Sequence, residues 1–308
     1  MKIRIATRGS DLALTQARYI AKRLERELRV ETELLVLTTK GDQILDRPLA
    51  DIGGKGLFIK EIEEALVDGR AEVAVHSAKD LPAQVPDGLQ LCAYPQREDC
   101  RDALVTSKPG GTLENLPKGA RVGTGSVRRT ALLKSLRPDL KIVPLRGNVQ
   151  TRLNKLVSED LDAVMLACAG LDRLGLSDQI SERLDPAIFV PAATQGILAL
   201  ETRADDPAAE IISQLNDPDA ALAAITERAF LGTLEGDCSV PLAGYAYLRD
   251  DGLMTFDGLV SSLDGKKIAR AQAAAPPADA AALGREVAKK VLEAGGDKIL
   301  KALGTHRK

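Results

Sequence analysis

Apolar and polar residues alternate with a period of two over residues 2–7, which predicts a half-buried strand at the start of the chain. Downstream, Leu14, Ala17, Leu24 and Leu28 recur at the spacing of one helical face, and Ser10 can cap that helix. Residues 31–38 and 71–75 are typical of further strands, and residues 58–68 of a helix. The glycine-rich stretch 39–56 lacks apolar periodicity and predicts a lid over a charged ligand.

A second series of strands and helices begins near residue 101. We expect strands at 121–124, 141–145 and 163–167, helices at 127–136 and 148–157, and returning strands at 188–192 and 196–201. Strands that alternate with helices predict parallel sheets, here in two lobes. From residue 217 the pattern changes to a helix (219–231), three alternating strands (244–248, 253–260 and 267–273) and an amphipathic helix (285–294).

These patterns predict an α/β protein with two lobes and a smaller C-terminal α+β domain. The expected first domain comprises residues 1–95 and 197–216 and includes the lid loop 39–56. The second domain comprises residues 96–196, and the third residues 217–308.

Five arginines follow strand-like runs, where ligands of open α/β sheets bind. They are Arg8, Arg128, Arg129, Arg146 and Arg152. Guanidinium groups gathered at such an edge bind oxyanions bidentately. Ser126 can also cap the helix that carries Arg128, which adds backbone N–H groups and the helix dipole to the same site. We therefore expect a ligand with several carboxylates or phosphates.

Composition excludes several other classes of protein. The formal net charge of the 308 residues is −2 and aromatic residues make up 3% with no Trp, so neither a field nor a stacking surface for nucleic acid is expected. No apolar run approaches the roughly 20 residues of a spanning helix, and the start has no apolar signal core, so we expect no membrane partner and a cytoplasmic location. The two histidines and four cysteines show no metal-ligand spacing.

The cysteines lie in different surroundings. Cys92 and Cys168 stand in apolar runs and are expected to be small buried residues. Cys238 stands in a polar turn, where a reactant can reach its thiol.

Seven short motifs occur in one order along nearly the whole chain. They are Ile5-Ala-Thr-Arg-Gly-Ser-Asp-Leu-Ala-Leu14, Gly53-Gly-Lys-Gly-Leu-Phe58, Val75-His-Ser-Ala-Lys-Asp-Leu-Pro82, Val122-Gly-Thr-Gly-Ser-Val-Arg-Arg129, Leu145-Arg-Gly-Asn-Val149, Pro191-Ala-Ala-Thr-Gln-Gly196 and Leu234-Glu-Gly-Asp-Cys238. In these motifs the chain resembles the hydroxymethylbilane synthase, or porphobilinogen deaminase, family.

The resemblance implies a transferase of haem and tetrapyrrole biosynthesis. Such enzymes join four porphobilinogen molecules head to tail, release ammonia at each step and free the linear tetrapyrrole by hydrolysis. The growing chain is held on a dipyrromethane cofactor, bound as a thioether to the cysteine that Cys238 matches. A thiolate can capture the electrophilic pyrrole that forms when the aminomethyl group leaves. The resemblance also implies a monomer without a metal.

Site residues follow from the same resemblance. Asp80 matches the catalytic carboxylate, which can stabilise positive charge on a pyrrole nitrogen and transfer protons. Lys79 and Arg8 accompany it as catalytic residues, whereas His76 is expected to be structural rather than the base. The residues expected to bind the cofactor are Cys238, Asp42, Ser77, Lys79, Thr124, Ser126, Arg128, Arg129 and Gln195, and those expected to bind substrate are Arg8, Ser10, Lys55, Phe58, Arg146 and Arg152.

Two positions depart from the family pattern. Asp51 stands where some members have a basic residue, and Asp237 precedes the attachment cysteine where glycine is frequent. A carboxylate beside a thiol disfavours the thiolate, so Asp237 can lower the reactivity of Cys238.

The alternative hypothesis is a non-catalytic anion-binding receptor of the periplasmic-binding-protein type, because such receptors also have two α/β lobes. The loop cysteine in an added domain, the missing signal segment and the number of arginines favour the enzyme.

Overall fold

The computed structural model describes residues 2–39, 59–234 and 240–304, which form two compact units. The first unit comprises Met1–Glu98 and Ile197–Ala221, and the second comprises Asp99–Gly196 and Leu222–Lys308. The chain therefore leaves the first unit near residue 98 and returns to it near residue 197.

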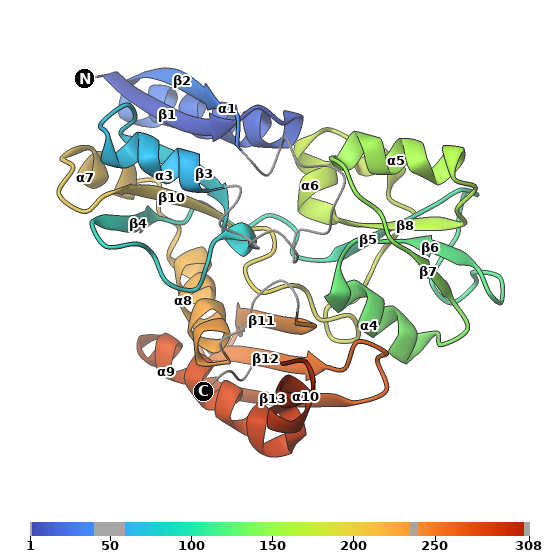
Figure 1. The fold of residues 1–308 in the computed structure, drawn as a ribbon. Helices are drawn as coiled ribbons and strands as arrows, with labels where there is room; N and C mark the ends of the chain where they lie inside the picture. The colour runs from blue at the N-terminus through green and yellow to red at the C-terminus, as the bar shows by residue number, and fades with distance from the viewer. Residues whose placement is uncertain (1, 40–58, 235–239, 305–308) are drawn as a thin grey trace. The chain divides into compact units, whose positions relative to one another are not determined.

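The first unit is an α/β lobe around one mixed sheet. Its elements are β1 (Lys2–Arg8), α1 (Asp11–Leu28), β2 (Glu31–Leu37), α3 (Lys60–Val67), β3 (Val73–Ser77), the 3-10 turn η3 (Ala78–Asp80), β4 (Leu89–Ala93), β10 (Leu198–Arg203) and α7 (Ala208–Ser213) (Figure 1). The strand order is β2-β1-β3-β10-β4. Strand β1 runs parallel to β2 and β3, and β10 runs antiparallel to β3 and β4.

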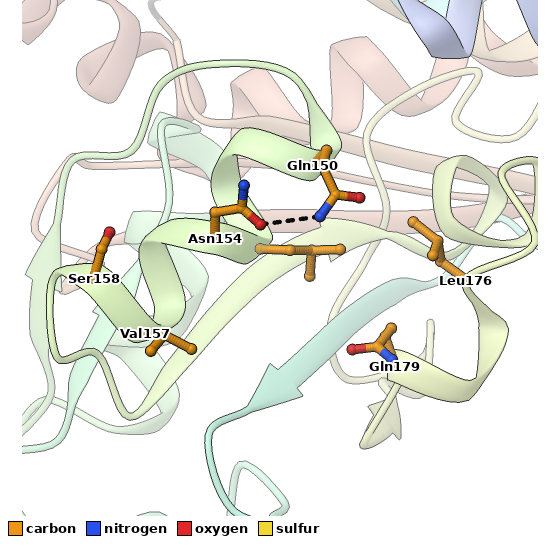
Figure 2. A pocket seen from close by; sticks show the side chains of 7 residues that line it. Gln150, Asn154, Val157, Ser158, Leu176 and Gln179 are labelled. Carbon is orange, nitrogen blue, oxygen red and sulfur yellow. Dashed lines mark hydrogen bonds between the residues drawn. The ribbon is translucent and has the colours of Figure 1, made fainter.

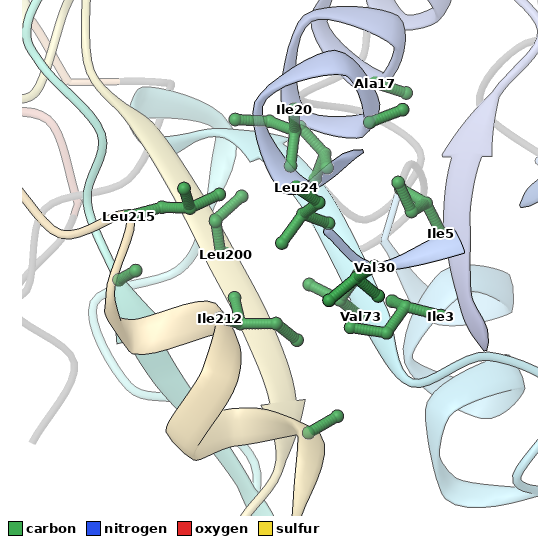
Figure 3. Close-up of a cluster of buried hydrophobic side chains, with 14 of the residues drawn as sticks. Ile3, Ile5, Ala17, Ile20, Leu24, Val30, Val73, Leu200, Ile212 and Leu215 are labelled. Carbon is green, nitrogen blue, oxygen red and sulfur yellow. The ribbon is translucent and has the colours of Figure 1, made fainter. Parts of the chain in front are cut away.

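Both faces of this sheet are covered, because the side chains of β1 alternate between them. Ile3 and Ile5 pack on one face with Ile20 and Leu24 of α1 and with Ile212 of α7 (Figure 3). Ala6 packs on the other face in a cluster with Ile62 and Leu66 of α3. This buried core fixes the strand ends that carry the candidate site.

The second unit contains an α/β lobe with the same strand arrangement. Its elements are β5 (Asp102–Thr106), β6 (Arg121–Gly123), α4 (Val127–Leu136), β7 (Lys141–Val143), α5 (Val149–Ser158), β8 (Ala163–Ala167), α6 (Cys168–Arg173), the 3-10 turn η4 (Ser177–Gln179) and β9 (Glu182–Arg183). The order is β7-β6-β8-β5-β9, with β6 parallel to β7 and β8, and β5 antiparallel to β8 and β9.

The second unit also contains a three-stranded antiparallel sheet with helices. Its elements are α8 (Pro218–Thr233, which begins in the first unit), β11 (Leu242–Leu248), β12 (Met254–Ser261), β13 (Ile268–Ala275), the turn η5 (Pro277–Asp279), α9 (Ala280–Val291), a π-helical turn η6 (Leu292–Gly296) and α10 (Asp297–Ala302). Ala243 and Leu259 of this sheet share a buried cluster with Leu132 and Leu133 of α4.

The predicted fold class is confirmed: the chain has two α/β lobes and a small C-terminal sheet domain. The prediction of parallel sheets was wrong, because β5 and β10 run antiparallel to their neighbours. The strand predicted at 188–192 was also wrong. Ile188 is exposed and Phe189 buried in a turn, and the edge strand is β9. Strands β4 and β5 were not predicted, and the domain boundaries stay predictions.

Candidate functional site

The first group of predicted site residues lies at one edge of the first sheet. Arg8 ends β1 and Ser77 ends β3, and both strands run in the same direction. Ser10 caps α1 by accepting a hydrogen bond from the amide of Ala13 at 3.4 Å. Lys79 and Asp80 follow in the turn η3, where Lys79 is half-buried and Asp80 exposed. The structure thus brings Arg8, Ser10, Ser77, Lys79 and Asp80 to the same sheet edge.

Sequence reasoning missed a residue that orients this edge. Gln16 of α1 is buried, and its Nε2 donates to Ser77 Oγ at 3.0 Å. A buried amide that faces a strand end fixes the direction of the serine hydroxyl. Gln16 lies four residues before Ile20, one turn along the same buried face of α1, which was the available signal.

His76, one residue before Ser77, points into the core. Its Nε2 lies 2.9 Å from Oε2 of Glu201 on β10, and both side chains are buried. This placement agrees with the expected structural role of His76.

The second group lies at the strand ends of the second unit, in two loops that pack against each other. The loop after β6 contains Thr124 and Ser126, and the loop after β7 contains Arg146. The amide of Thr124 donates to the carbonyl of Val143 at 2.9 Å, and the amide of Leu145 to that of Thr124 at 3.2 Å. A Cβ on Gly125 would clash with the carbonyl oxygen of Leu145, so this close approach requires glycine.

Each of these loops leads into a capped helix. Ser126 accepts a hydrogen bond from the amide of Arg129 at the start of α4, at 3.4 Å. Asn148 accepts one from the amide of Thr151 at the start of α5, at 2.8 Å. Arg152 Nε donates to the carbonyl of Gly147 at 2.9 Å. Two neighbouring strand–helix loops with helix N-termini and arginines form a site suited to anions.

Arg128 and Arg129 are buried, and their guanidinium groups donate several hydrogen bonds to other residues of the chain. Both guanidinium groups bind the carboxylate of Asp102, at 2.7 and 2.9 Å from Arg128 and 2.7 Å from Arg129. Gln195 Nε2 also donates to Asp102 at 3.3 Å and to the carbonyl of Cys100 at 2.8 Å. Burial would raise the pKa of Asp102, but the charges of Arg128 and Arg129 outweigh it and hold that pKa below its usual range.

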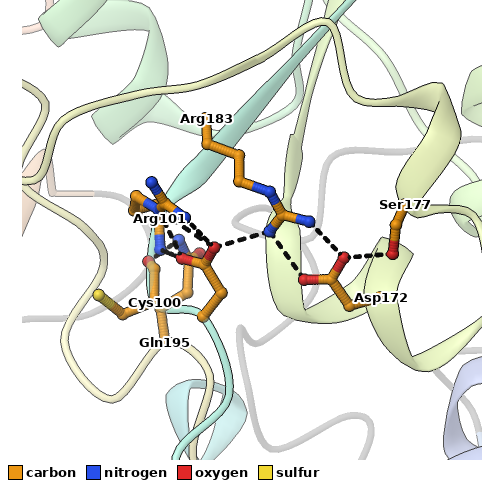
Figure 4. A network of polar contacts seen from close by, with 7 residues as sticks. Cys100, Arg101, Asp172, Ser177, Arg183 and Gln195 are labelled. Carbon is orange, nitrogen blue, oxygen red and sulfur yellow. Dashed lines mark hydrogen bonds and ion pairs between the residues drawn. The ribbon is translucent and has the colours of Figure 1, made fainter.

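Asp102 was missed because strand β5, which it begins, was not predicted, and an aspartate outside any predicted element is normally exposed. A second network of ion pairs begins three residues earlier in the sequence, at Asp99: Arg183 binds Asp172 and Asp99, and Arg101 binds Asp99 (Figure 4).

The thiols of Cys92 and Cys168 are unsuited to nucleophilic attack. Burial, as the main cause, raises the pKa of Cys92 to about 11 and that of Cys168 to about 12. The thiolate is the reactive form, so both stay inert near neutral pH. The predicted attachment residue Cys238, with Asp237, lies outside the described residues, as do Asp42, Asp51, Lys55 and Phe58.

Other candidate sites are poorly suited to the expected ligand. An open groove of about 540 Å³ is lined by uncharged residues of α5 and the segment after α6, among them Gln150, Asn154, Val157, Leu176 and Gln179 (Figure 2). None of the predicted site residues lines it. Within 2–39, 59–234 and 240–304, no three His, Cys, Asp or Glu side chains form a potential metal site, and no helix could span a membrane.

Comparisons with known proteins decide between the enzyme and the receptor. The family model "Porphobilinogen deaminase, dipyromethane cofactor binding domain" matches residues 3–211, and "Porphobilinogen deaminase, C-terminal domain" matches residues 221–293. The chain belongs to the porphobilinogen deaminase family. As a member it is a transferase, a hydroxymethylbilane synthase of porphyrin and haem biosynthesis, with a dipyrromethane cofactor. The hypothesis of a non-catalytic anion-binding receptor is not better supported than the enzyme.

Curated relatives in the porphobilinogen deaminase family agree over nearly the full length. Porphobilinogen deaminase of Syntrophobacter fumaroxidans is 48% identical over 98% of this chain and 97% of its own. That of Syntrophotalea carbinolica is 50% identical over 98% and 96%, respectively. Among solved structures, the methionine-binding protein MetQ covers 74% of this chain and 94% of its own at 16% identity and a TM-score of 0.42. The fold assignment rests on the sheets described above and not on that remote likeness.

Proposed function

We propose that this chain joins four porphobilinogen molecules head to tail on a dipyrromethane attached to Cys238, and then releases the tetrapyrrole by hydrolysis. In each condensation the bond from the aminomethyl carbon to nitrogen breaks, a carbon–carbon bond forms to the next ring, and ammonia carries away the proton lost from that ring. The observation that carries the proposal is a polar strand-end site in each lobe: an exposed carboxylate at the same sheet edge as Arg8 in one lobe, and arginines at two helix N-termini in the other.

Asp80 is the carboxylate to which we assign the chemistry. Its exposed carboxylate at the end of β3 can accept a hydrogen bond from a pyrrole N–H and stabilise the positive charge that develops on that nitrogen. The same carboxylate can move the proton that each step must transfer. Arg8 and Lys79 add positive charge at the same edge, where they can hold the carboxylates of the reacting ring.

The second unit fits the cofactor's acidic side chains. Each pyrrole carries an acetate and a propionate, and the loops after β6 and β7 offer hydroxyl groups, helix N-termini and guanidinium groups. The Nε of Arg128 is buried and has no hydrogen-bond partner within the part of the chain that is described. When bound, the cofactor supplies the pyrrole carbon to which the first substrate is joined. We assign Thr124, Ser126, Arg128, Arg129, Gln195, Ser77, Lys79 and Asp42 to the cofactor, and Arg8, Ser10, Lys55, Phe58, Arg146 and Arg152 to substrate.

A three-domain organisation with the boundaries 1–95 with 197–216, 96–196 and 217–308 belongs to the same proposal. A monomeric state, a cytoplasmic location and the lack of nucleic-acid binding also stay predictions. Size-exclusion chromatography with light scattering tests the monomer.

Covalent loading tests the proposed function. The intact mass of the purified chain should exceed the sequence mass by two linked pyrroles, and an acidic pyrrole reagent should turn it pink. Cys238→Ser should abolish both signals while Cys92→Ser leaves them unchanged, because the Cys92 thiol is protonated. Loading that persists in Cys238→Ser would overturn the assignment of the attachment site.

A further inference from the structure

Asp102 lies in none of the seven sequence motifs, yet it is the centre of a buried cluster. It begins β5, its exposed fraction is 0%, and its two carboxylate oxygens accept hydrogen bonds from Arg128, Arg129 and Gln195. A carboxylate with no access to water stays ionised only where cations and donors surround it. The cluster therefore has a fixed geometry that depends on Asp102.

Further contacts immobilise the two guanidinium groups. Arg128 donates to the carbonyl of Val190 at 2.9 Å, and its guanidinium carbon lies 5.8 Å from the centre of the Phe189 ring. Arg129 donates to the carbonyl of Met165 at 3.0 Å. Burial lowers the pKa of Arg129, and the charge of Asp102 opposes this effect.

The cluster still has charge and donors to offer an anion. Two guanidinium groups and one carboxylate leave a net charge of +1. A guanidinium has five N–H groups. Within the described residues, three of them are used in Arg128 and two in Arg129. The remaining N–H groups of Arg128 and Arg129 have fixed directions, because the hydrogen bonds of the other N–H groups fix each planar guanidinium.

We propose that Asp102 is a positioning residue, which holds Arg128 and Arg129 so that their remaining N–H groups meet the carboxylates of the dipyrromethane. This inference rests on the proposed function, since it takes the cofactor as the ligand of both arginines. Asp102 does not contact the cofactor itself. Its carboxylate keeps two like charges together and orients them, and Gln195 links it to the backbone of Cys100 at the start of the second unit.

Asp99 offers a matched control, three residues away. Its carboxylate also binds two arginines, with Arg101 Nη2 at 2.7 Å and Arg183 Nη1 at 2.6 Å, but neither arginine is assigned to the cofactor. Asp102→Asn and Asp99→Asn each remove one negative charge from a carboxylate held by two guanidinium groups. The two variants therefore differ in which arginines they release.

The test compares loading in folded protein. Wild type, Asp102→Asn and Asp99→Asn are produced identically, their thermal unfolding is recorded, and intact mass gives the fraction that carries two linked pyrroles. We expect Asp99→Asn to load as wild type does, and Asp102→Asn to load at least about tenfold less, the effect of losing one charge-assisted hydrogen bond. Asp102→Glu keeps the charge but moves the oxygens by one methylene, and its loading should also fall.

The outcomes separate the two proposals. A wild-type chain of bare sequence mass would contradict the proposed function. A loaded wild type with equally loaded Asp102→Asn, or with equally loaded Asp102→Glu, would overturn the positioning role. If neither Asp102 variant folds, Asp102 serves stability and the inference is wrong.

Discussion

Asp80 and His76 lie four residues apart in one motif, and their substitution should have opposite effects. Asp80 is exposed in the turn η3, whereas the His76 side chain is 5% exposed and the Glu201 side chain 1% exposed. We predict that Asp80→Asn removes activity and leaves stability unchanged. We predict that His76→Leu lowers stability and leaves the activity of the folded fraction intact.

The magnitudes follow from these surroundings. His76→Leu deletes the donor 2.9 Å from Glu201 Oε2, while Oε1 of Glu201 already has no hydrogen-bond partner among the described residues. A buried carboxylate without donors should cost about 2–5 kcal/mol of unfolding free energy. At roughly 2–4 °C per kcal/mol, Tm should fall by about 4–20 °C. Asp80→Asn at an exposed position should change stability by less than about 0.5 kcal/mol and turnover by at least about 10²-fold.

Calorimetry and a porphobilinogen consumption assay on folded, cofactor-loaded protein measure both quantities. His76→Gln is the matched control, because its amide can still donate to Glu201 and should recover part of the lost Tm. An Asp80→Asn enzyme within a few-fold of wild-type turnover would refute the catalytic role. A His76→Leu protein with wild-type Tm would show that the contact with Glu201 contributes nothing.

Three further predictions concern other groups. Arg146→Leu and Arg152→Leu should load the cofactor but stall, so native mass spectrometry after a brief substrate pulse should show enzyme with one, two or three added rings; a distribution like that of wild type would contradict their substrate role. Burial raises the pKa of the half-buried Cys92 to about 11 and of the buried Cys168 to about 12, so iodoacetamide at pH 8 should leave both unmodified in the folded chain, and rapid alkylation of either would contradict the raised pKa. Burial, with a smaller effect of a neighbouring carboxylate, raises the pKa of Glu63, so its contribution to stability is present below the unfolded pKa and lost as pH rises through the folded pKa. Glu63→Gln should therefore raise Tm more at pH 8 than at pH 4, and an equal change at both pH values would contradict this.

Periodicity predicted most elements but not strand direction. The alternation over residues 2–7 and the helical stripe after Ser10 correspond to β1 and α1. The run 196–201 predicts a buried strand, and β10 occupies Leu198–Arg203. An apolar run looks the same in a parallel and an antiparallel strand, so only pairing with β3 and β4 reveals its direction.

The sequence predicted where the site residues lie, but not which side chains they contact. Strand-end placement identified Arg128 and Arg129, and the structure puts them at the start of α4. Their binding to Asp102 depends on β5, which pairs with β8 across about sixty residues of sequence. Long-range pairing of this kind leaves no local pattern, so a buried aspartate and a surface one look identical in the sequence.

The position of β10 has a consequence for the order in which the chain can fold. In the sheet β2-β1-β3-β10-β4, the inner strand β10 (Leu198–Arg203) lies between β3 and β4. The ribosome synthesises β10 long after both of these neighbours. Every strand of sheet β7-β6-β8-β5-β9 lies between Asp102 and Arg183. During synthesis the second lobe can therefore complete its sheet first. Until β10 is made, β4 has no partner strand and β3 is paired on one side only. A chain cut after residue 196 would retain every strand of the sheet that includes β5 to β9, but would leave the first lobe without the strand that joins β3 to β4.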